Sequence, residues 1–257
     1  MNNTVYECEN KDMLSVNSQI AVLIGQNDHG NLITQDISSI PHFLICGFSG
    51  SGKTSFIQNM LIQICKSQSS ETVKLFIYDS KAIDYAAFNG VPHLLIPVIT
   101  EERRAVGMIS WLNTEVQCRI SAFNSVGVRT LESFNQKCND PKPRIFAVLD
   151  DFSSARTDKD TVAKLISVLR FGRTVGIHCI LATSTPAAIE RDIMSNLPCR
   201  ISFCVSNCAD SRTVIGQNGA ESLQVPGEMI FKYQNILAKC KATHIPSSDI
   251  QTALKNV

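Results

Sequence analysis

The chain has 257 residues, of which 44% are hydrophobic and 18% charged, so it can bury a sizeable core and lies near the upper length of a single domain. Lysine and arginine together number 24 and aspartate and glutamate 23, and the net charge of +1 excludes a surface that is strongly basic throughout, although a local basic patch is allowed. No apolar run is long enough to cross a bilayer and the polar first residues lack the order of a signal peptide, so we expect a soluble cytoplasmic protein, associated with a membrane only through other domains or partners.

The first half of the chain alternates between short apolar segments and stretches with helical periodicity. Residues 1–19 are polar and are expected to form an N-terminal arm or edge segment before one domain over residues 20–257. The apolar segments show no polar alternation, which is typical of strands covered on both faces. In chain order we expect a strand at residues 42–46, a helix at 54–66, a strand at 73–78 and a helix at 101–123.

The second half continues this alternation after a loop at residues 138–143. The expected elements are a strand at 145–149, a helix at 159–172, a strand at 177–182, a helix at 187–196, a strand at 201–205, a short helix at 210–215, a strand at 229–232 and a short helix at 247–255. Strands that alternate with helices predict an α/β fold with a mostly parallel central sheet and helices on both faces.

Residues 47–54 carry the first chemical motif. Their sequence, GFSGSGKT, matches the phosphate-loop pattern G-x-x-x-x-G-K-[ST] at every fixed position, between a predicted strand and a predicted helix. In this pattern backbone N–H groups surround phosphate oxygens, the lysine reaches the outer phosphates and the last hydroxyl ligates magnesium. We expect Lys53 to be catalytic and Thr54 to be a magnesium ligand; the weaker alternative is a turn that matches by chance. The residues expected to contact the nucleotide are Gly47, Ser49, Gly50, Ser51, Gly52, Lys53, Thr54 and Ser55.

Two acids, Asp150 and Asp151, end the apolar segment that begins at Arg144. A phosphate loop needs an acid on a neighbouring strand to hold the metal, and we expect Asp150 in that role. Asp151 is expected to orient or activate the attacking water, a role more often carried by glutamate. Its carboxylate is shorter by about one methylene, and a misplacement of about 1 Å can cost roughly a hundredfold in rate. Either the strand lies closer to the phosphates or hydrolysis is slow; the alternative is that the two acids simply end a strand.

Longer segments carry a resemblance to a known family. They are IPHFLICGFSGSGKT (40–54), GVPHLLIPVIT (90–100), FNSVGVRTLESFN (123–135), GRTVGIHCILATSTP (172–186), CRISFCVSNCADSRTVI (199–215) and GAESL (219–223). From about residue 20 to 241 the chain resembles the motor domain of the FtsK/SpoIIIE family, ring-forming ATPases that pump duplex DNA, with relatives in conjugation and type VII secretion. The resemblance implies a RecA-like P-loop NTPase fold, ATP and Mg²⁺ as cofactors, a ring oligomer such as a hexamer, and duplex DNA as the cargo.

One departure from the family pattern lies directly after the strand expected at residues 177–182. The family reads A-T-Q after this strand, with the amide sensing the terminal phosphate, whereas this chain reads Ala182-Thr183-Ser184. Ser184 is therefore a further catalytic candidate that acts through a water. Both Asp151 and Ser184 depart from the family at the hydrolysis step, so the resemblance implies nucleotide binding more firmly than turnover.

Three arginines are candidates for a residue that faces a nucleotide across a subunit boundary. Arg212 lies in a family string, Asp210-Ser211-Arg212, and pairing with Asp210 is the alternative. Arg173 and Arg119 are further candidates for a finger that stabilises charge in a neighbour's site. For both, a plain solvated face is the alternative.

Candidate DNA contacts lie in the loops that the resemblance places at the pore of the ring. They are Arg156, Lys159 and Arg191, with solvated helix faces as the alternative. A useful complex neutralises roughly six to ten phosphates, so six subunits need about one or two cations each, and the near-zero net charge is no objection.

Two functions therefore remain open. The first is an ATPase of the DNA-translocase type, which the nearly complete set of other family strings favours. The second is a weakly hydrolysing or non-hydrolysing nucleotide-binding module that docks a secretion or conjugation partner protein, which the departures at Asp151 and Ser184 favour.

Overall fold

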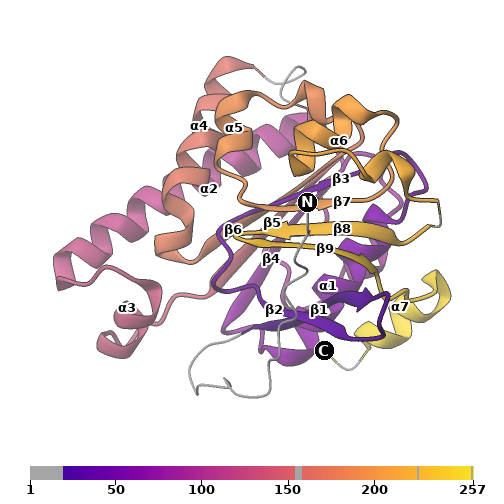
Figure 1. The fold of residues 1–257 in the computed structure, drawn as a ribbon. Coiled ribbons are helices and arrows are strands. Elements are labelled where there is room, and N and C mark those ends of the chain that lie inside the picture. Colours follow the sequence, from indigo (N-terminus) through magenta and orange to yellow (C-terminus); the bar gives the residue numbers. More distant parts are fainter. Residues whose placement is uncertain (1–19, 154–157, 225, 256) are drawn as a thin grey trace.

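The computed structural model describes residues 20–153, 158–224, 226–255 and 257. In these residues a sheet of nine strands lies between helices on both of its faces (Figure 1), which confirms the expected α/β fold. The arm predicted for residues 1–19 and the predicted DNA contact Arg156 lie outside the described residues.

Five neighbouring strands form the parallel half of the sheet. They are β3 (Phe43–Cys46), β4 (Val73–Asp79), β5 (Arg144–Asp150), β6 (Ile177–Thr183) and β7 (Cys199–Ser202). Their spatial order is β7-β3-β6-β5-β4, and each adjacent pair runs parallel. All residues of β5 and β6 are buried, as expected for strands covered on both faces. Because the strands are parallel, their carboxyl ends meet at one edge of the sheet, which we call the carboxyl edge.

Antiparallel strands extend the sheet beyond β7. In spatial order they are β8 (Glu228–Tyr233), β9 (Ile236–Lys241), β1 (Ala21–Asn27) and β2 (Leu32–Asp36). Of these only β8 is predicted from the sequence: β9 and β2 are largely exposed or half-buried and lack a continuous apolar run, and β1 has only a short apolar segment, Ala21 to Ile24, before polar residues. The expected parallel pairing therefore holds for the half of the sheet that contains β3.

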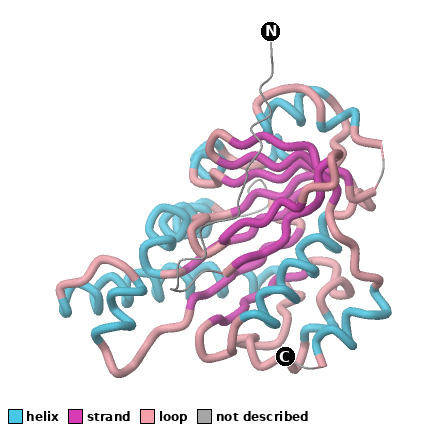
Figure 2. Tube along the Cα trace, turned by 60° about the horizontal axis from the view of Figure 1, so that its bottom comes forward, coloured by secondary structure: helices cyan, strands magenta, loops and turns pink. Residues whose placement is uncertain are grey.

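Helices cover both faces of the sheet, which Figure 2 shows as a band of strands with helices on either side. The hydrophobic clusters on the two faces assign the helices: α1 (Lys53–Ser67) and α7 (Ser247–Leu254) to one face, and α2 (Glu102–Val126), α3 (Leu131–Lys137), α4 (Lys159–Phe171), α5 (Arg191–Ser195) and α6 (Cys208–Ile215) to the other. Within the described ranges, none of the helices has the length and apolar character needed to span a membrane.

Two helical segments differ from the prediction. The helix expected at residues 187–196 is divided, because Ile189 and Glu190 are extended between a 3₁₀ turn (Pro186–Ala188) and α5. Helix α3 was not predicted; it begins after Thr130, whose hydroxyl accepts a hydrogen bond from Ser133 N at 3.2 Å and caps the helix.

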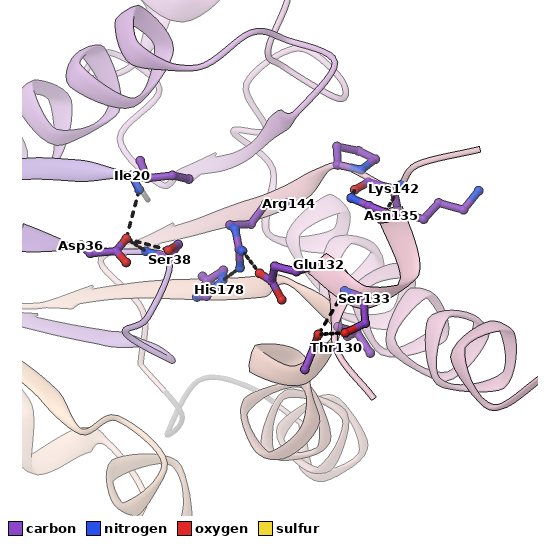
Figure 3. A network of polar contacts seen from close by, with 12 residues as sticks. Ile20, Asp36, Ser38, Thr130, Glu132, Ser133, Asn135, Lys142, Arg144 and His178 are labelled. Atoms are coloured by element: carbon purple, nitrogen blue, oxygen red, sulfur yellow. Dashed lines mark hydrogen bonds and ion pairs between the residues drawn. The ribbon is translucent and has the colours of Figure 1, made fainter. Parts of the chain in front are cut away.

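A buried polar network lies at the amino ends of β5 and β6, opposite to the carboxyl edge (Figure 3). Arg144 Nη1 lies 2.9 Å from His178 Nε2, and the guanidinium also pairs with Glu132 of α3. His178 Nδ1 lies 2.8 Å from the carbonyl oxygen of Ile40. Since a carbonyl can only accept, Nδ1 carries the proton and Nε2 accepts from Arg144. The His178 ring is therefore neutral.

Acid is expected to destabilise the fold through His42 and His178. Burial lowers the pKa of each ring to about 3, and the Arg144 charge adds to this at His178. A histidine in the unfolded chain has a pKa of about 6.5. As the pH falls from about 6.5 towards 3, the unfolded state binds protons that the folded state does not, so the free energy of unfolding decreases over that range. Denaturant unfolding measured at a series of pH values reports this slope.

A variant separates the histidine effect from general acid denaturation. His178→Gln removes one of the two buried rings and should give a shallower dependence of the unfolding free energy on pH. His29→Gln, at an exposed position, is the control and should keep the original slope. The same slope in the wild type and both variants would contradict the neutral, buried state of His178.

Candidate functional site

The phosphate loop connects β3 to α1 and adopts a shape that requires glycine. Gly47, Gly50 and Gly52 have φ angles of +153°, +82° and +110°, which other residues rarely adopt. A Cβ atom added at Gly47 would lie 2.6 Å from Ser51 Oγ and 2.7 Å from Phe203 Cβ, so a larger residue does not fit there. The glycines of the motif are therefore needed for the conformation of the loop.

Neighbouring segments hold the loop at the carboxyl edge. Phe48 N donates to Cys204 O at 2.8 Å, just beyond β7, and Gly227 N, just before β8, donates to Ser51 O at 3.0 Å. The hydroxyl of Ser51 is buried and has no hydrogen-bond partner among the described residues. An α-helix leaves its first N–H groups without intrahelical partners and carries partial positive charge at that end. The loop and the start of α1 together offer the donors and the charge that a phosphate needs.

Lys53, the first residue of α1, places its ammonium group over the loop. Its Nζ donates to Gly47 O at 2.7 Å and to Phe48 O at 3.1 Å. Burial lowers the pKa of Lys53, the Asp150 carboxylate opposes this, and the positive charge of Lys81 lowers it further. A second cation, Lys81, therefore acts on the same site from the loop after β4.

The structure brings Thr54 and Asp150 together, although 96 residues separate them. Thr54 Oγ1 lies 3.5 Å from Asp150 Oδ2, while Asp150 Oδ1 accepts a hydrogen bond from Asp151 N at 2.9 Å. Asp150 ends β5, and β6 lies between β5 and the strand of the phosphate loop. Burial raises the pKa of this carboxyl; the Tyr85 hydroxyl, the Asp151 N–H and the Lys53 charge act in the opposite direction.

These two side chains fit a magnesium ion. A hydroxyl oxygen and a buried carboxylate are hard oxygen ligands, and Mg²⁺ is commonly held by one or two such groups together with phosphates. Thr54 and Asp150 would hold the ion next to Lys53. Their roles as ligands stay a prediction.

Asp151 has a backbone conformation that favours aspartate over glutamate at this position. Its φ is +57°, in the left-handed region, where aspartate and asparagine are tolerated better than other non-glycine residues. The side chain is half-buried and lines a small cavity with Ser80, Glu102 and Phe152 at the amino end of α2. The left-handed backbone therefore gives a structural reason for aspartate instead of glutamate at this position, separate from any effect on hydrolysis.

Replacing Asp151 by glutamate is expected to strain the chain without accelerating hydrolysis. The left-handed conformation costs an ordinary residue about 1–2 kcal/mol. Asp151→Glu should therefore unfold more easily than Asp151→Asn, which keeps a residue suited to this conformation, and its ATPase rate should not exceed that of the wild type. Thermal unfolding and steady-state hydrolysis measure the two effects. A Glu variant that is as stable as the Asn variant and hydrolyses ATP faster than the wild type would refute this explanation.

Ser184 lies beside the phosphate loop, directly after β6, the strand that contains Ala182 and Thr183. Thr183, the last residue of β6, is paired with Cys46 of β3, and the carbonyl oxygen of Thr183 accepts a hydrogen bond from Gly47 N at 3.3 Å. The residue is exposed at the carboxyl edge. Its action through a water stays a prediction.

Arg119 does not match the expectation of a finger that reaches a neighbouring subunit. It is 3% exposed, its Nε pairs with Glu115 at 2.7 Å, and its Nη1 donates to Pro143 O at 2.8 Å and to Val175 O at 2.9 Å. These bonds tie α2 to the segments that precede β5 and β6. The prediction was wrong because a sequence pattern does not distinguish a buried arginine from an exposed one.

The other two arginines are exposed, at opposite edges of the sheet. Arg212 lies on α6, which follows β7 at the carboxyl edge, and Asp210 accepts instead from Asn207 Nδ2 at 2.9 Å. Within the part of the chain that the structure describes, Arg212 forms no ion pair, so the alternative of an Asp210–Arg212 pair is not seen. Arg173 lies in the turn before β6, at the amino edge.

Two predicted DNA contacts are exposed at helix starts. Lys159 opens α4, which follows β5, and Arg191 opens α5, which follows β6. A helix that follows a parallel strand begins near the carboxyl end of that strand, so both cations lie towards the carboxyl edge. Contact with DNA stays a prediction for both.

The loop after β4 belongs to the site but was missed by sequence reasoning. Asp79 Oδ1 accepts from Lys81 N at 3.1 Å, and its Oδ2 accepts from Asp84 N at 2.8 Å and from Tyr85 N at 3.0 Å. Asp79 is also paired in register with Asp150 on β5. An acid at the end of a predicted strand, followed two residues later by a lysine, was the available signal.

The fold and this edge of the sheet define a P-loop nucleotide-binding protein of the α/β class. The profile of the FtsK/SpoIIIE family matches residues 7–222, and the chain belongs to that family. The DNA translocase FtsK of Caldanaerobacter subterraneus subsp. tengcongensis is 34% identical over 228 residues, covering 87% of this chain and 32% of that protein. The chain thus spans about a third of the length of such curated relatives.

Solved structures share the fold. The pCW3 conjugation coupling protein TcpA, in its monomer form with ATPgS, has a TM-score of 0.79 at 23% identity, over 93% of this chain and 71% of that one. The cytoplasmic domain of the Thermomonospora curvata Type VII Secretion ATPase EccC has a TM-score of 0.81 at 24% identity, over 93% of this chain and 31% of that one. At these identities the likeness establishes the fold.

Proposed function

We propose that this chain is an ATP-hydrolysing motor domain that moves duplex DNA through a ring of its copies. The observation that carries the proposal is the approach of Thr54 and Asp150 beside Lys53 at the carboxyl edge. Relatives named as DNA translocases support the cargo. Hydrolysis, the ring and DNA binding by this chain are the parts of the proposal that experiments must test.

Different residues of the chain bind the phosphates, hold the metal and orient the attacking water. Backbone N–H groups of the loop and the start of α1 bind phosphate oxygens, and the Lys53 ammonium leaves the carbonyl oxygens of the loop for the outer phosphates. Thr54 and Asp150 would hold Mg²⁺, and the ion would neutralise charge that develops on the phosphates. Asp151 and Ser184 orient the attacking water.

The ring supplies the remaining groups. Arg212, exposed and unpaired among the described residues, is the arginine we assign to a neighbour's nucleotide, with Arg173 as the weaker candidate. Lys159 and Arg191 contact the DNA backbone in the pore, and the sequence adds Arg156, which lies outside the described residues. These contacts go to phosphates, so binding should weaken steeply with salt and depend little on sequence.

A second function, a nucleotide-binding module that docks a partner protein and hydrolyses little or no ATP, is favoured by the residues at positions 151 and 184. Asp151 lines a cavity at α2 and has a backbone conformation unsuited to glutamate, and Ser184 replaces an amide. Both residues depart from the family pattern at the hydrolysis step.

Steady-state ATPase activity with and without duplex DNA separates the two functions. A motor should be stimulated by DNA, and its mass in solution should rise to that of a ring when ATP and Mg²⁺ are present. Lys159→Ala should reduce the stimulation, while Arg170→Ala, at the other end of α4 and also exposed, is the matched control. Tight ATP binding without turnover in either condition would contradict the motor and leave the docking module.

A further inference from the structure

One polar atom next to the candidate metal site has no explanation in the fold alone. The hydroxyl of Tyr85 is buried in a side chain that is 0% exposed, and no acceptor among the described residues meets it with full hydrogen-bond geometry, although it lies close enough to the Asp150 carboxylate to lower the pKa of that acid. Leaving a buried hydroxyl without a partner costs free energy in the folded state. Buried polar groups are satisfied in the great majority of proteins, so this one calls for a partner in the working state.

The loop that carries Tyr85 is fixed against both halves of the candidate site. Tyr85 N donates to Asp79, the residue that pairs in register with Asp150. On the other side, Gln58 of α1 donates to the carbonyl oxygen of Asp84. Gln58 lies four residues after Thr54, on the same face of the helix. The loop therefore lies between the end of β4, which is paired with the end of β5, and the face of α1 that carries Thr54.

Among the described carboxylates near the Tyr85 hydroxyl, Asp150 has the most acceptor capacity left. Three carboxylates interact electrostatically with this side chain: Asp150, Asp84 and Asp79. Both oxygens of Asp79 already accept backbone N–H groups, and Asp84 lies 3.7 Å from the Lys81 ammonium in an ion pair. Asp150 accepts one N–H on Oδ1 and stands 3.5 Å from the Thr54 hydroxyl on Oδ2. It is the remaining partner for Tyr85.

We propose that Tyr85 is a positioning residue for Asp150: its hydroxyl donates to the Asp150 carboxylate when nucleotide and magnesium are bound, and so fixes the oxygen that faces Thr54. This inference rests on the proposed function, because it assigns a partner to the acid of that site. With Asp151 N and Tyr85 both donating, the carboxylate cannot rotate away from the metal. Groups that hydrogen-bond to a metal ligand without touching the metal typically contribute about 10- to 100-fold to metal affinity.

The variant Tyr85→Phe removes the hydroxyl alone, because the ring can stay packed beside Phe88, 6.2 Å away between centroids. Binding of a non-hydrolysable ATP analogue is measured at a series of Mg²⁺ concentrations and in EDTA. We expect the Mg²⁺ concentration for half-maximal binding to rise about tenfold, and binding in EDTA to stay unchanged. Tyr233→Phe, a buried tyrosine on β8, is the matched control and should behave as the wild type.

A double-mutant cycle shows whether Tyr85 acts through Asp150. In an Asp150→Asn background, Tyr85→Phe should change the Mg²⁺ requirement no further. An unchanged Mg²⁺ requirement in Tyr85→Phe overturns the inference, and so does an equal tenfold change in the Asn background. Should Tyr85→Phe fail to fold, Tyr85→Leu is used in the same titration.

The failure of the proposed function would look different. The motor fails when the wild type binds ATP without turnover, and the nucleotide site itself fails when the wild type shows no nucleotide binding that depends on Mg²⁺. If the wild type binds in this way and Tyr85→Phe does the same at the same Mg²⁺ concentration, only the role of Tyr85 is lost.

Discussion

Lys53→Ala is expected to reduce ATP hydrolysis by about a hundredfold or more. The Lys53 ammonium is the positive group held over the phosphate loop, with its Nζ at 2.7 Å from Gly47 O and 3.1 Å from Phe48 O. Removing one preorganised donor from developing charge typically costs about 10²–10³ in rate. Steady-state hydrolysis and equilibrium binding of ATP measure the loss, and binding should weaken as well, because the lysine also contacts the bound phosphates.

Two comparisons make this result specific. Lys66→Ala removes an exposed lysine from the last turn of the same helix and should leave hydrolysis unchanged. Thermal unfolding of Lys53→Ala checks that the loop survives the loss of two hydrogen bonds. A Lys53→Ala protein that is folded and retains the wild-type rate would show that the loop does not serve the reaction.

Asp150→Asn is expected to abolish turnover and to leave the protein at least as stable as before. The carboxylate is 5% exposed and burial raises its pKa, so its negative charge costs free energy in the folded state without metal. The neutral amide avoids this cost but loses the charge that holds Mg²⁺. Because a bound metal supplies several kcal/mol of charge stabilisation, the rate should fall by at least about a hundredfold.

The stability and activity of this variant are measured together. Denaturant unfolding without nucleotide should give an unfolding free energy equal to or above that of the wild type, a trade-off common at functional sites. Asp140→Asn, at an exposed acid, is the control and should change neither quantity. Wild-type turnover in Asp150→Asn would place the metal elsewhere.

The parallel half of the fold could be predicted because its signals are local. Segments such as residues 145–149 are apolar throughout, which only strands covered on both faces need, and the structure buries every residue of β5. The phosphate loop could be predicted because its conformation leaves no room for side chains at certain positions, most clearly at Gly47, so the motif must contain glycine there. These features depend on a few neighbouring residues.

The rest depends on contacts between distant segments. Strand β9 is half-exposed and becomes a strand through pairing with β8 and β1. Arg119 is buried because carbonyl oxygens from two other segments converge on it. The left-handed backbone at Asp151 arises where the chain leaves β5. A local sequence pattern does not show which distant segments a residue will contact.

The loop with Lys81 and Tyr85 shows the same limit at the site. Its place beside Asp150 follows from the register of β4 and β5, which pairs Asp79 with Asp150. A sequence pattern can identify the phosphate loop and the acid that ends a strand, but it does not give the neighbour of that strand. The groups that orient the acid therefore emerge only from the structure.

A crystal structure with a non-hydrolysable ATP analogue and Mg²⁺ tests the central claim most directly. We predict the phosphates within the loop of residues 47–54, Lys53 Nζ turned from the carbonyl oxygens to the outer phosphates, and a metal ion beside Thr54 Oγ1 and Asp150. An analogue bound at another place, or a loop that stays free of nucleotide at saturating concentration, would contradict it.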